Sequence, residues 1–389
     1  MRHSPTWVLL LMLAGCATTP PLTATGPEPK APERSSLDAT PASMAAPAPA
    51  AEGQVAPARW RVASEKGKAR ASSGMANLAV DGDRQSEWNP RTAIKPGAPQ
   101  WLALPLEAPA AGTLAVAWHG HGMHYQYGEY GRPRSYEVQV SSNSTDGDDG
   151  DWRTVETITD NMVRSRVATF KAPGARWVRL RFLDVWDGRY QMEPYIREAA
   201  VYEAEGAGAA DVWLVMGDSV TSVGFDPAEP DTFTGAVAER HPGHWPILLS
   251  GGTGGDEAAN AVKRLEVALP TLPPGSVVGL CYGTNDATRG VSVADYKARL
   301  QVAIDMLKAA GHQPVVAVVP WSLNGRIAEY AAACRELTAA NDLPPGPDFF
   351  GYFKAHPEEL RTDKVHPTEA GVRSMQRLWA ETAAWRYAR

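Results

Sequence analysis

The stretch VWLVMGDSVT, Val212 to Thr221, decides how the C-terminal half of this 389-residue chain is interpreted. Five apolar residues run directly into Gly-Asp-Ser, as a buried strand does where it reaches the edge of a sheet. Gly, Asp and Ser are also the commonest residues of turns. The tripeptide alone therefore leaves open whether Ser219 is a catalytic nucleophile or an ordinary turn serine.

The surrounding sequence predicts alternating strands and helices. Its strand-like runs are apolar at consecutive positions, as expected where helices cover both faces of a sheet. We therefore expect an α/β domain with three layers and a parallel sheet, whose ligands lie at the carboxyl ends of the strands. Further strands are predicted at 245–250, 276–282 and 314–320, with helices at 256–269 and 293–311.

Four polar clusters lie at or near these strand ends: GDS at 217–219, GGTGGDE at 251–257, GTND at 283–286 and TDKVHPTEAG at 362–371. Each is weak alone, but together and in this order they resemble the SGNH (GDSL) hydrolase superfamily. The resemblance covers residues 210–389 and favours the nucleophile over the turn serine. Val220 stands where the family name has a leucine.

The resemblance assigns a catalytic triad to Ser219, His366 and Asp363. A serine hydroxyl attacks poorly until a neighbouring base takes its proton. His366 is expected to be that base, and Asp363 to orient the imidazole and stabilise its charged form. The alternative is that Asp363 and His366 only cap the last helix.

The same resemblance assigns an oxyanion hole, because acyl transfer develops charge that needs fixed donors. The expected donors are the backbone N–H groups of Ser219 and Gly255 and the side-chain amide of Asn285. Gly254 is the alternative to Gly255, and Asn285 could instead satisfy a loop carbonyl. No cofactor is expected for catalysis. Walker-type and Rossmann phosphate patterns are absent, so no nucleotide is implied.

The N-terminus predicts export. An apolar run at 7–13 follows Arg2 and is too short to span a bilayer, so residues 1–16 are interpreted as a signal peptide. LAGC, ending at Cys16, resembles the lipobox of bacterial lipoproteins, which implies cleavage before Cys16 and acylation of its thiol. We expect a lipid-anchored protein of the bacterial cell envelope, in the outer membrane; a plain signal peptide is the alternative.

Residues 17–57 predict a disordered tether, because they are rich in Ala and Pro and poor in large apolar residues. Residues 58–206 instead show period-two runs separated by turn residues, which predicts an antiparallel β-sandwich. This segment resembles the discoidin-like (coagulation-factor type C) jelly roll at 77–89, 132–143, 175–182 and 196–204.

The discoidin-like resemblance implies a structural calcium ion. Carried over by position, its ligands are Asp81, Ser86, Glu198 and the carbonyls of Leu78 and Asp83. Hard oxygen ligands of this kind suit Ca²⁺. A metal-free turn capped by its own Asp side chains is the alternative, and the sequence does not choose between them.

Two remaining features leave alternatives open, and the charge excludes one class of partner. Tyr125, Tyr127 and Tyr130 are expected either to stack on sugars or to contact the neighbouring domain. Cys281 and Cys334 are either paired or free and buried. A net charge of −6 without a basic run argues against nucleic acid as a partner.

The combined hypothesis is an exported serine esterase that removes acyl groups, most simply acetyl, from carbohydrate through an acyl-enzyme. Its partners are an acylated polysaccharide as substrate and the membrane that holds its lipid anchor. One alternative is a lipolytic or thioester hydrolase that uses the same residues. Another is a surface glycan-binding protein with a vestigial hydrolase domain.

Overall fold

The computed structural model describes residues 59–83, 86–120, 131–186, 192–205, 211–222 and 232–387. All of them belong to one compact unit, Pro47–Arg389. Cys16, the expected tether and the loop with Tyr125, Tyr127 and Tyr130 lie outside the described residues. In the part of the chain that is described, no helix is both long enough and apolar enough to cross a membrane.

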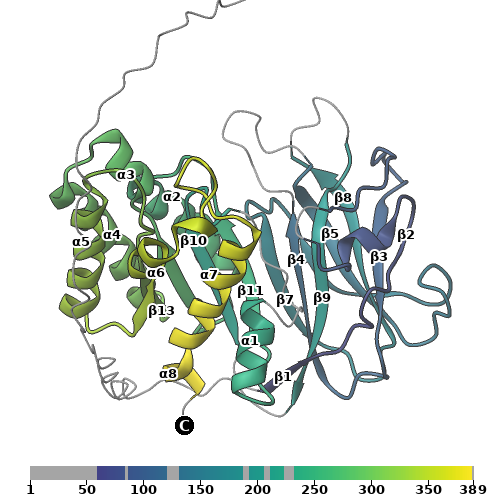
Figure 1. The fold of residues 1–389 in the computed structure, drawn as a ribbon. Helices are drawn as coiled ribbons and strands as arrows, with labels where there is room; N and C mark the ends of the chain where they lie inside the picture. Colours follow the sequence, from purple (N-terminus) through teal and green to yellow (C-terminus); the bar gives the residue numbers. More distant parts are fainter. Residues whose placement is uncertain are drawn as a thin grey trace, which may run out of the picture. The chain divides into compact units, whose positions relative to one another are not determined.

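The N-terminal part is an antiparallel β-structure of two sheets (Figure 1). One sheet has the order β1-β9-β4-β7 and the other β2-β3-β8-β5-β6. The strands are β1 (Arg59–Val62), β2 (Arg70–Ala71), β3 (Gln100–Pro105), β4 (Thr113–Gly120), β5 (Pro133–Ser141), β6 (Arg153–Ile158), β7 (Ser165–Lys171), β8 (Trp177–Val185) and β9 (Ile196–Glu205), with a short 3₁₀ helix, η1 (Ala76–Ala79).

Large aromatic side chains form the core of this β-structure. Trp88, Trp118, Tyr136 and Phe182 are each at most 1 % exposed and belong to one apolar cluster. The indole of Trp118 donates a 3.0 Å hydrogen bond to the Tyr136 hydroxyl, so the polar tips of both rings are satisfied inside the core. The expected antiparallel β-rich segment is therefore present.

The C-terminal part contains a five-stranded parallel sheet of order β11-β10-β12-β13-β14. Its strands are β10 (Val212–Gly217), β11 (Ile247–Gly252), β12 (Val277–Cys281), β13 (Gln313–Val318) and β14 (Pro345–Asp348). The helices are α1 (Phe233–Arg240), α2 (Ala258–Ala268), α3 (Thr284–Arg289), α4 (Val293–Ala309), α5 (Ile327–Ala340), α6 (Phe349–Ala355), α7 (Glu369–Thr382) and α8 (Ala384–Tyr387), with two 3₁₀ turns, η2 (Leu269–Thr271) and η3 (Pro357–Glu359).

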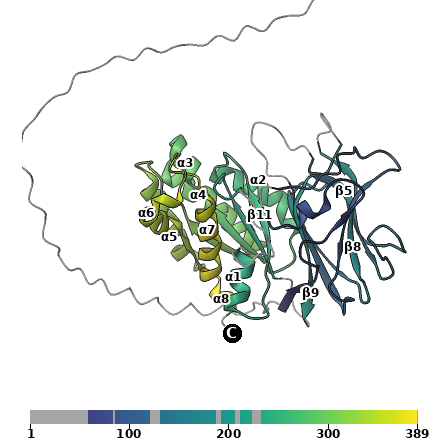
Figure 2. The ribbon, with the colours of Figure 1, turned by 45° about the vertical axis from the view of Figure 1, so that its right-hand side comes forward.

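Strand β10 shows why these runs are apolar at every position. Leu214 and Met216 pack in a cluster with residues of α2, α4 and α5, whereas Trp213 and Val215 pack in a second cluster with residues of α1 and α7. Helices thus cover both faces of the sheet, as Figures 1 and 2 show. This arrangement confirms the predicted α/β domain with a parallel sheet.

The two β-structures meet along β11, the edge strand of the parallel sheet, which packs against β4 and β7. Arg164, just before β7, donates to the Ser250 hydroxyl at 2.8 Å and to the Ser250 carbonyl at 3.3 Å. Cys281 and Cys334 are both buried and free, which resolves the alternative that the sequence left open.

Candidate active site

The turn after β10 carries Ser219 and is closely packed. Backbone N–H groups of Thr221 and Ser222 donate to the Asp218 carbonyl at 3.1 and 3.0 Å. A Cβ on Gly217 would lie 2.4 Å from both the Cys281 carbonyl and the Thr221 hydroxyl. Glycine is therefore required where the strand enters this turn.

Asp218 shapes this turn from inside. Its carboxylate is 1 % exposed and accepts the Val220 N–H at 2.9 Å. Burial raises the pKa of Asp218 to about 7, against the opposing effect of that hydrogen bond. A carboxylate so enclosed supports the backbone beside Ser219 and is not presented to a substrate.

The last cluster brings a histidine onto Ser219. His366 Nε2 lies 2.8 Å from Ser219 Oγ, and His366 Nδ1 lies 2.8 Å from an Asp363 carboxylate oxygen. The other Asp363 oxygen accepts the backbone N–H groups of Val365 and His366 at 2.9 and 3.0 Å. The structure thus places the three residues predicted as a triad in one hydrogen-bonded chain.

Asp363 is held in its ionised form. Burial acts to raise its pKa, but hydrogen bonds from the His366 side chain and from the backbone of His366 and Val365 outweigh it and lower the pKa to about 2. An acceptor that stays charged near neutral pH keeps a proton on the facing Nδ1. The lone pair of Nε2 is then directed at the Ser219 hydroxyl.

Two of the three expected oxyanion donors lie on the turn after β11 and at the start of α3. Gly255 has a φ of +82°, in a turn closed by the Asp256 N–H donating to Thr253 O at 3.2 Å. Asn285 donates from its side-chain amide to Asp256 O at 2.9 Å. Because that amide carries two hydrogens, one remains for a bound oxyanion. Asn285 thus bonds a loop carbonyl, as the alternative interpretation expected, and its second amide hydrogen is not needed for that bond.

The predicted calcium ligands from one loop also come together. The Ser86 hydroxyl lies 3.1 Å from Leu78 O, 3.1 Å from Asp83 O, and 2.8 and 2.9 Å from the two Asp81 carboxylate oxygens. The Asp83 N–H also donates to Asp81 Oδ1 at 2.9 Å and the Ser86 N–H to Asp83 O at 3.1 Å, as in the metal-free turn capped by its own Asp side chain. Oxygen atoms of this kind are also the ligands that Ca²⁺ takes. Glu198 lies on β9 and is buried. Within the described residues, no three His, Cys, Asp or Glu side chains gather as a metal site, so the calcium ion stays a prediction.

His119 lies near the end of β4. It is 4 % exposed, with Nδ1 3.0 Å from the Ser165 hydroxyl. Burial, aided by the nearby Arg164 charge, lowers the pKa of His119 to about 3. This histidine is therefore a neutral core residue.

One residue that links α3 to the Gly255 turn was not predicted from the sequence. Arg289, at the end of α3, donates to the Gly255 carbonyl at 2.8 Å. The GTND motif ends three residues before it, and only a helical interpretation of TNDATR would have placed it on the same face as Asn285.

Comparison with known proteins agrees with this geometry. The model of the GDSL-like lipase/acylhydrolase family matches residues 215–373, which include Ser219, Asn285 and His366. Residues 215–373 are therefore a GDSL-type hydrolase domain. The family match makes the protein a carboxylic ester hydrolase. No curated protein matches the chain.

Three solved structures resemble parts of the chain. A lipase/acylhydrolase from Enterococcus faecalis is 22% identical, with 45% of this chain and 96% of that chain covered and a TM-score of 0.39. An acetylxylan esterase from Geobacillus stearothermophilus is 17% identical, with 46% and 94% covered and a TM-score of 0.37. Chitosan-binding module 1 of a chitosanase/glucanase from Paenibacillus sp. IK-5 is 23% identical, with 36% and 98% covered and a TM-score of 0.30.

Proposed function

We propose that this protein is an exported, lipid-anchored serine esterase that removes acyl groups, most simply acetyl, from carbohydrate. The observation that carries the catalytic part is the hydrogen-bonded chain from Ser219 Oγ through His366 to Asp363, with 2.8 Å at both links. In it the nucleophile, the base and the group that orients the base lie in the order that acyl transfer needs.

The reaction follows from this arrangement. His366 Nε2 takes the Ser219 proton while Oγ attacks the acyl carbon, and the negative charge on the former carbonyl oxygen is held by N–H groups of Ser219 and Gly255 and by the Asn285 amide. The intermediate collapses as His366 returns the proton to the departing sugar oxygen. A water molecule, deprotonated by His366, then attacks the acyl carbon of the acyl-enzyme. As this second intermediate collapses, His366 returns the proton to the departing Ser219 Oγ, and the acid is released.

In the same proposal, the β-sandwich is a discoidin-like domain that holds polymer close to the hydrolase and so raises the local substrate concentration.

The proposal includes a calcium ion in this domain. Bound by Leu78 O, Asp81, Asp83 O and Ser86, with Glu198 nearby, the ion would stabilise the loop that carries these residues. Chelation of calcium should then lower the melting temperature of the wild type. Asp81→Asn should lower it by a similar amount, and adding calcium to this variant should not raise it again. An unchanged melting temperature after chelation would remove the ion from the proposal.

Export and anchoring rest on the lipobox resemblance at Cys16. Metabolic labelling with a fatty-acid probe should tag the full-length protein and not Cys16→Ser. Label retained in Cys16→Ser, or absent from the wild type, would argue for the plain signal peptide instead.

The substrate class is tested by the length of the acyl chain. Acetyl esters should be hydrolysed with a higher kcat/KM than octanoyl esters, and acetate should be released from acetylated polysaccharides. Chromogenic esters from acetyl to decanoyl give the profile, with Ser219→Ala as the blank for each. A steady rise in kcat/KM with chain length would favour the lipolytic or thioester alternative. If the protein binds glycan but hydrolyses none of these esters, the result would favour the glycan-binding protein with a vestigial hydrolase domain.

A further inference from the structure

Helix α3 contacts the Gly255 turn through two side chains on one of its faces. Asn285 and Arg289 are four residues apart, which brings them to the same side of a helix. Asn285 donates to Asp256 O at 2.9 Å, and Arg289 Nη1 donates to Gly255 O at 2.8 Å. Two successive carbonyls of the turn are therefore held by one helix.

The turn needs such support because of its composition. Gly254 and Gly255 lack Cβ atoms, and glycine has the most backbone freedom to lose. With the carbonyls of Gly255 and Asp256 both bonded to α3, the peptide unit that follows Gly255 is held against this helix. The Gly255 N–H belongs to the preceding peptide unit, which is joined to the held one at the Gly255 Cα. Its direction relative to Asn285 therefore depends on the single rotation φ of Gly255.

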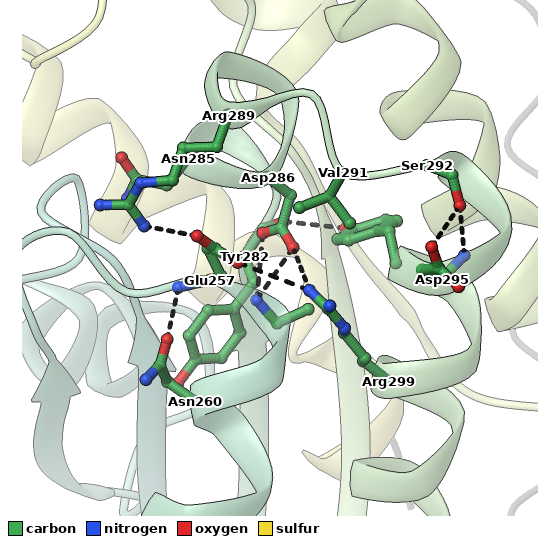
Figure 3. Close-up of polar contacts among 12 residues, drawn as sticks. Glu257, Asn260, Tyr282, Asn285, Asp286, Arg289, Val291, Ser292, Asp295 and Arg299 are labelled. Atoms are coloured by element: carbon green, nitrogen blue, oxygen red, sulfur yellow. Dashed lines mark hydrogen bonds and ion pairs between the residues drawn. The ribbon is translucent and has the colours of Figure 1, made fainter.

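Arg289 is itself held in place. The same Nη1 lies 2.7 Å from a carboxylate oxygen of Glu257, the residue before α2, as Figure 3 shows. The other Glu257 oxygen lies 3.5 Å from Arg299 of α4, and the Glu257 N–H donates to the Asn260 side chain at 2.9 Å. Glu257 thus links Arg289 to both α2 and α4.

A second contact fixes how far apart α2 and α3 lie. The Asp286 carboxylate accepts the Ala258 N–H, at the start of α2, at 3.0 and 3.2 Å, and Arg299 lies 3.9 Å from it. Asp286 is fully buried, whereas the Arg289 side chain is 48% exposed. Asp286 is therefore part of the core, and Arg289 can be replaced without opening a cavity.

We propose that Arg289 is a positioning residue of the oxyanion hole: by holding the Gly255 carbonyl it restricts where the Gly255 N–H lies relative to the Asn285 amide. This inference rests on the proposed function, in which both groups stabilise the oxyanion. It assigns Arg289 no contact with substrate. Its effect belongs to the transition state, where the donors must already point at the developing charge.

The test is Arg289→Ala in the full-length protein, assayed on a chromogenic acetate. We expect kcat to fall roughly tenfold with KM within about twofold, since loosening a donor costs less than the roughly 10²–10³-fold of removing one. Asn285→Ala, measured in parallel, supplies that larger value. The affinity for a boronic acid, which forms a tetrahedral anion on Ser219, should weaken in Arg289→Ala by a factor similar to the loss in kcat.

Added guanidinium should partly restore the activity of Arg289→Ala, because it can occupy the gap beside Gly255 O and Glu257. The matched control is Arg335→Ala on α5, whose side chain is 49% exposed and lies 3.0 Å from Asp348. It removes an equally exposed ion pair, so its kcat should be unchanged and should not respond to guanidinium. Surface ion pairs contribute little to stability, so both variants should keep the wild-type melting temperature.

Three results would overturn the proposal for Arg289: a kcat within twofold of wild type, a loss confined to KM, or a loss that follows a lower melting temperature and is not rescued by guanidinium. A wild type without esterase activity, or a Ser219→Ala variant with full activity, would instead reject the proposed function on which the inference rests. The two failures are therefore distinguishable.

Discussion

Replacing Ser219 by alanine should lower kcat by roughly 10⁴–10⁶-fold, as loss of a triad serine does in other hydrolases. In the proposed mechanism, Ser219 Oγ is the atom that forms the bond to the acyl group. It already lies 2.8 Å from His366 Nε2. The side chain contributes little else to the fold, so the variant should remain folded. The measurement is kcat on a chromogenic acetate together with the melting temperature.

A covalent probe makes this result specific to one hydroxyl. An organophosphorus reagent should label Ser219 in the wild type, and peptide mapping should place the label there. Ser222, whose hydroxyl donates to Ser219 O at 2.9 Å, is the nearest alternative serine in the turn. Ser292→Ala, which removes the N-cap of α4, is the control variant and should be labelled like wild type. A label on Ser222 together with an active Ser219→Ala variant would show that Ser222, and not Ser219, is the nucleophile.

Most of the parallel sheet could be predicted because its strands are buried on both faces. VWLVM was predicted as a strand and forms most of β10, and the predicted strand at 276–282 is β12, Val277–Cys281. Strand β14 was missed, because its sequence PGPD has the composition of a turn. Proline is tolerated there because β14 is an edge strand, where missing N–H donors are least costly.

The candidate site was predictable where its residues are close in sequence. Asp363 and His366 are three residues apart, so one turn can present both side chains. Arg289 and Gly255 are 34 residues apart, and their contact depends on how α3 packs beside the turn. No local pattern carries that information. The sequence motifs therefore predict the chemical groups, whereas the packing of the helices decides which residues hold them in position.

Asp363→Asn tests whether the carboxylate sets the histidine tautomer, and it should lower kcat by about 10⁴-fold. One Asp363 oxygen accepts the N–H groups of Val365 and His366. In the variant, the amide oxygen must take that place, because an amide nitrogen cannot accept these two donors. The NH₂ group then faces His366 Nδ1, which can only accept from it if its proton moves to Nε2. A protonated Nε2 cannot take the proton of Ser219.

The matched control for this prediction is Glu358→Gln. Glu358 and His356 form a second exposed carboxylate–histidine pair, with 3.2 Å between Oε1 and Nδ1, and no serine is proposed to act with it. The kcat of Glu358→Gln should stay within about twofold of wild type. Asp363→Asn should remain folded but lose its turnover. If Asp363→Asn retained more than a tenth of the wild-type kcat, Asp363 would serve only to shape the loop before α7. His366 would then have to act as the base without a carboxylate to fix its tautomer.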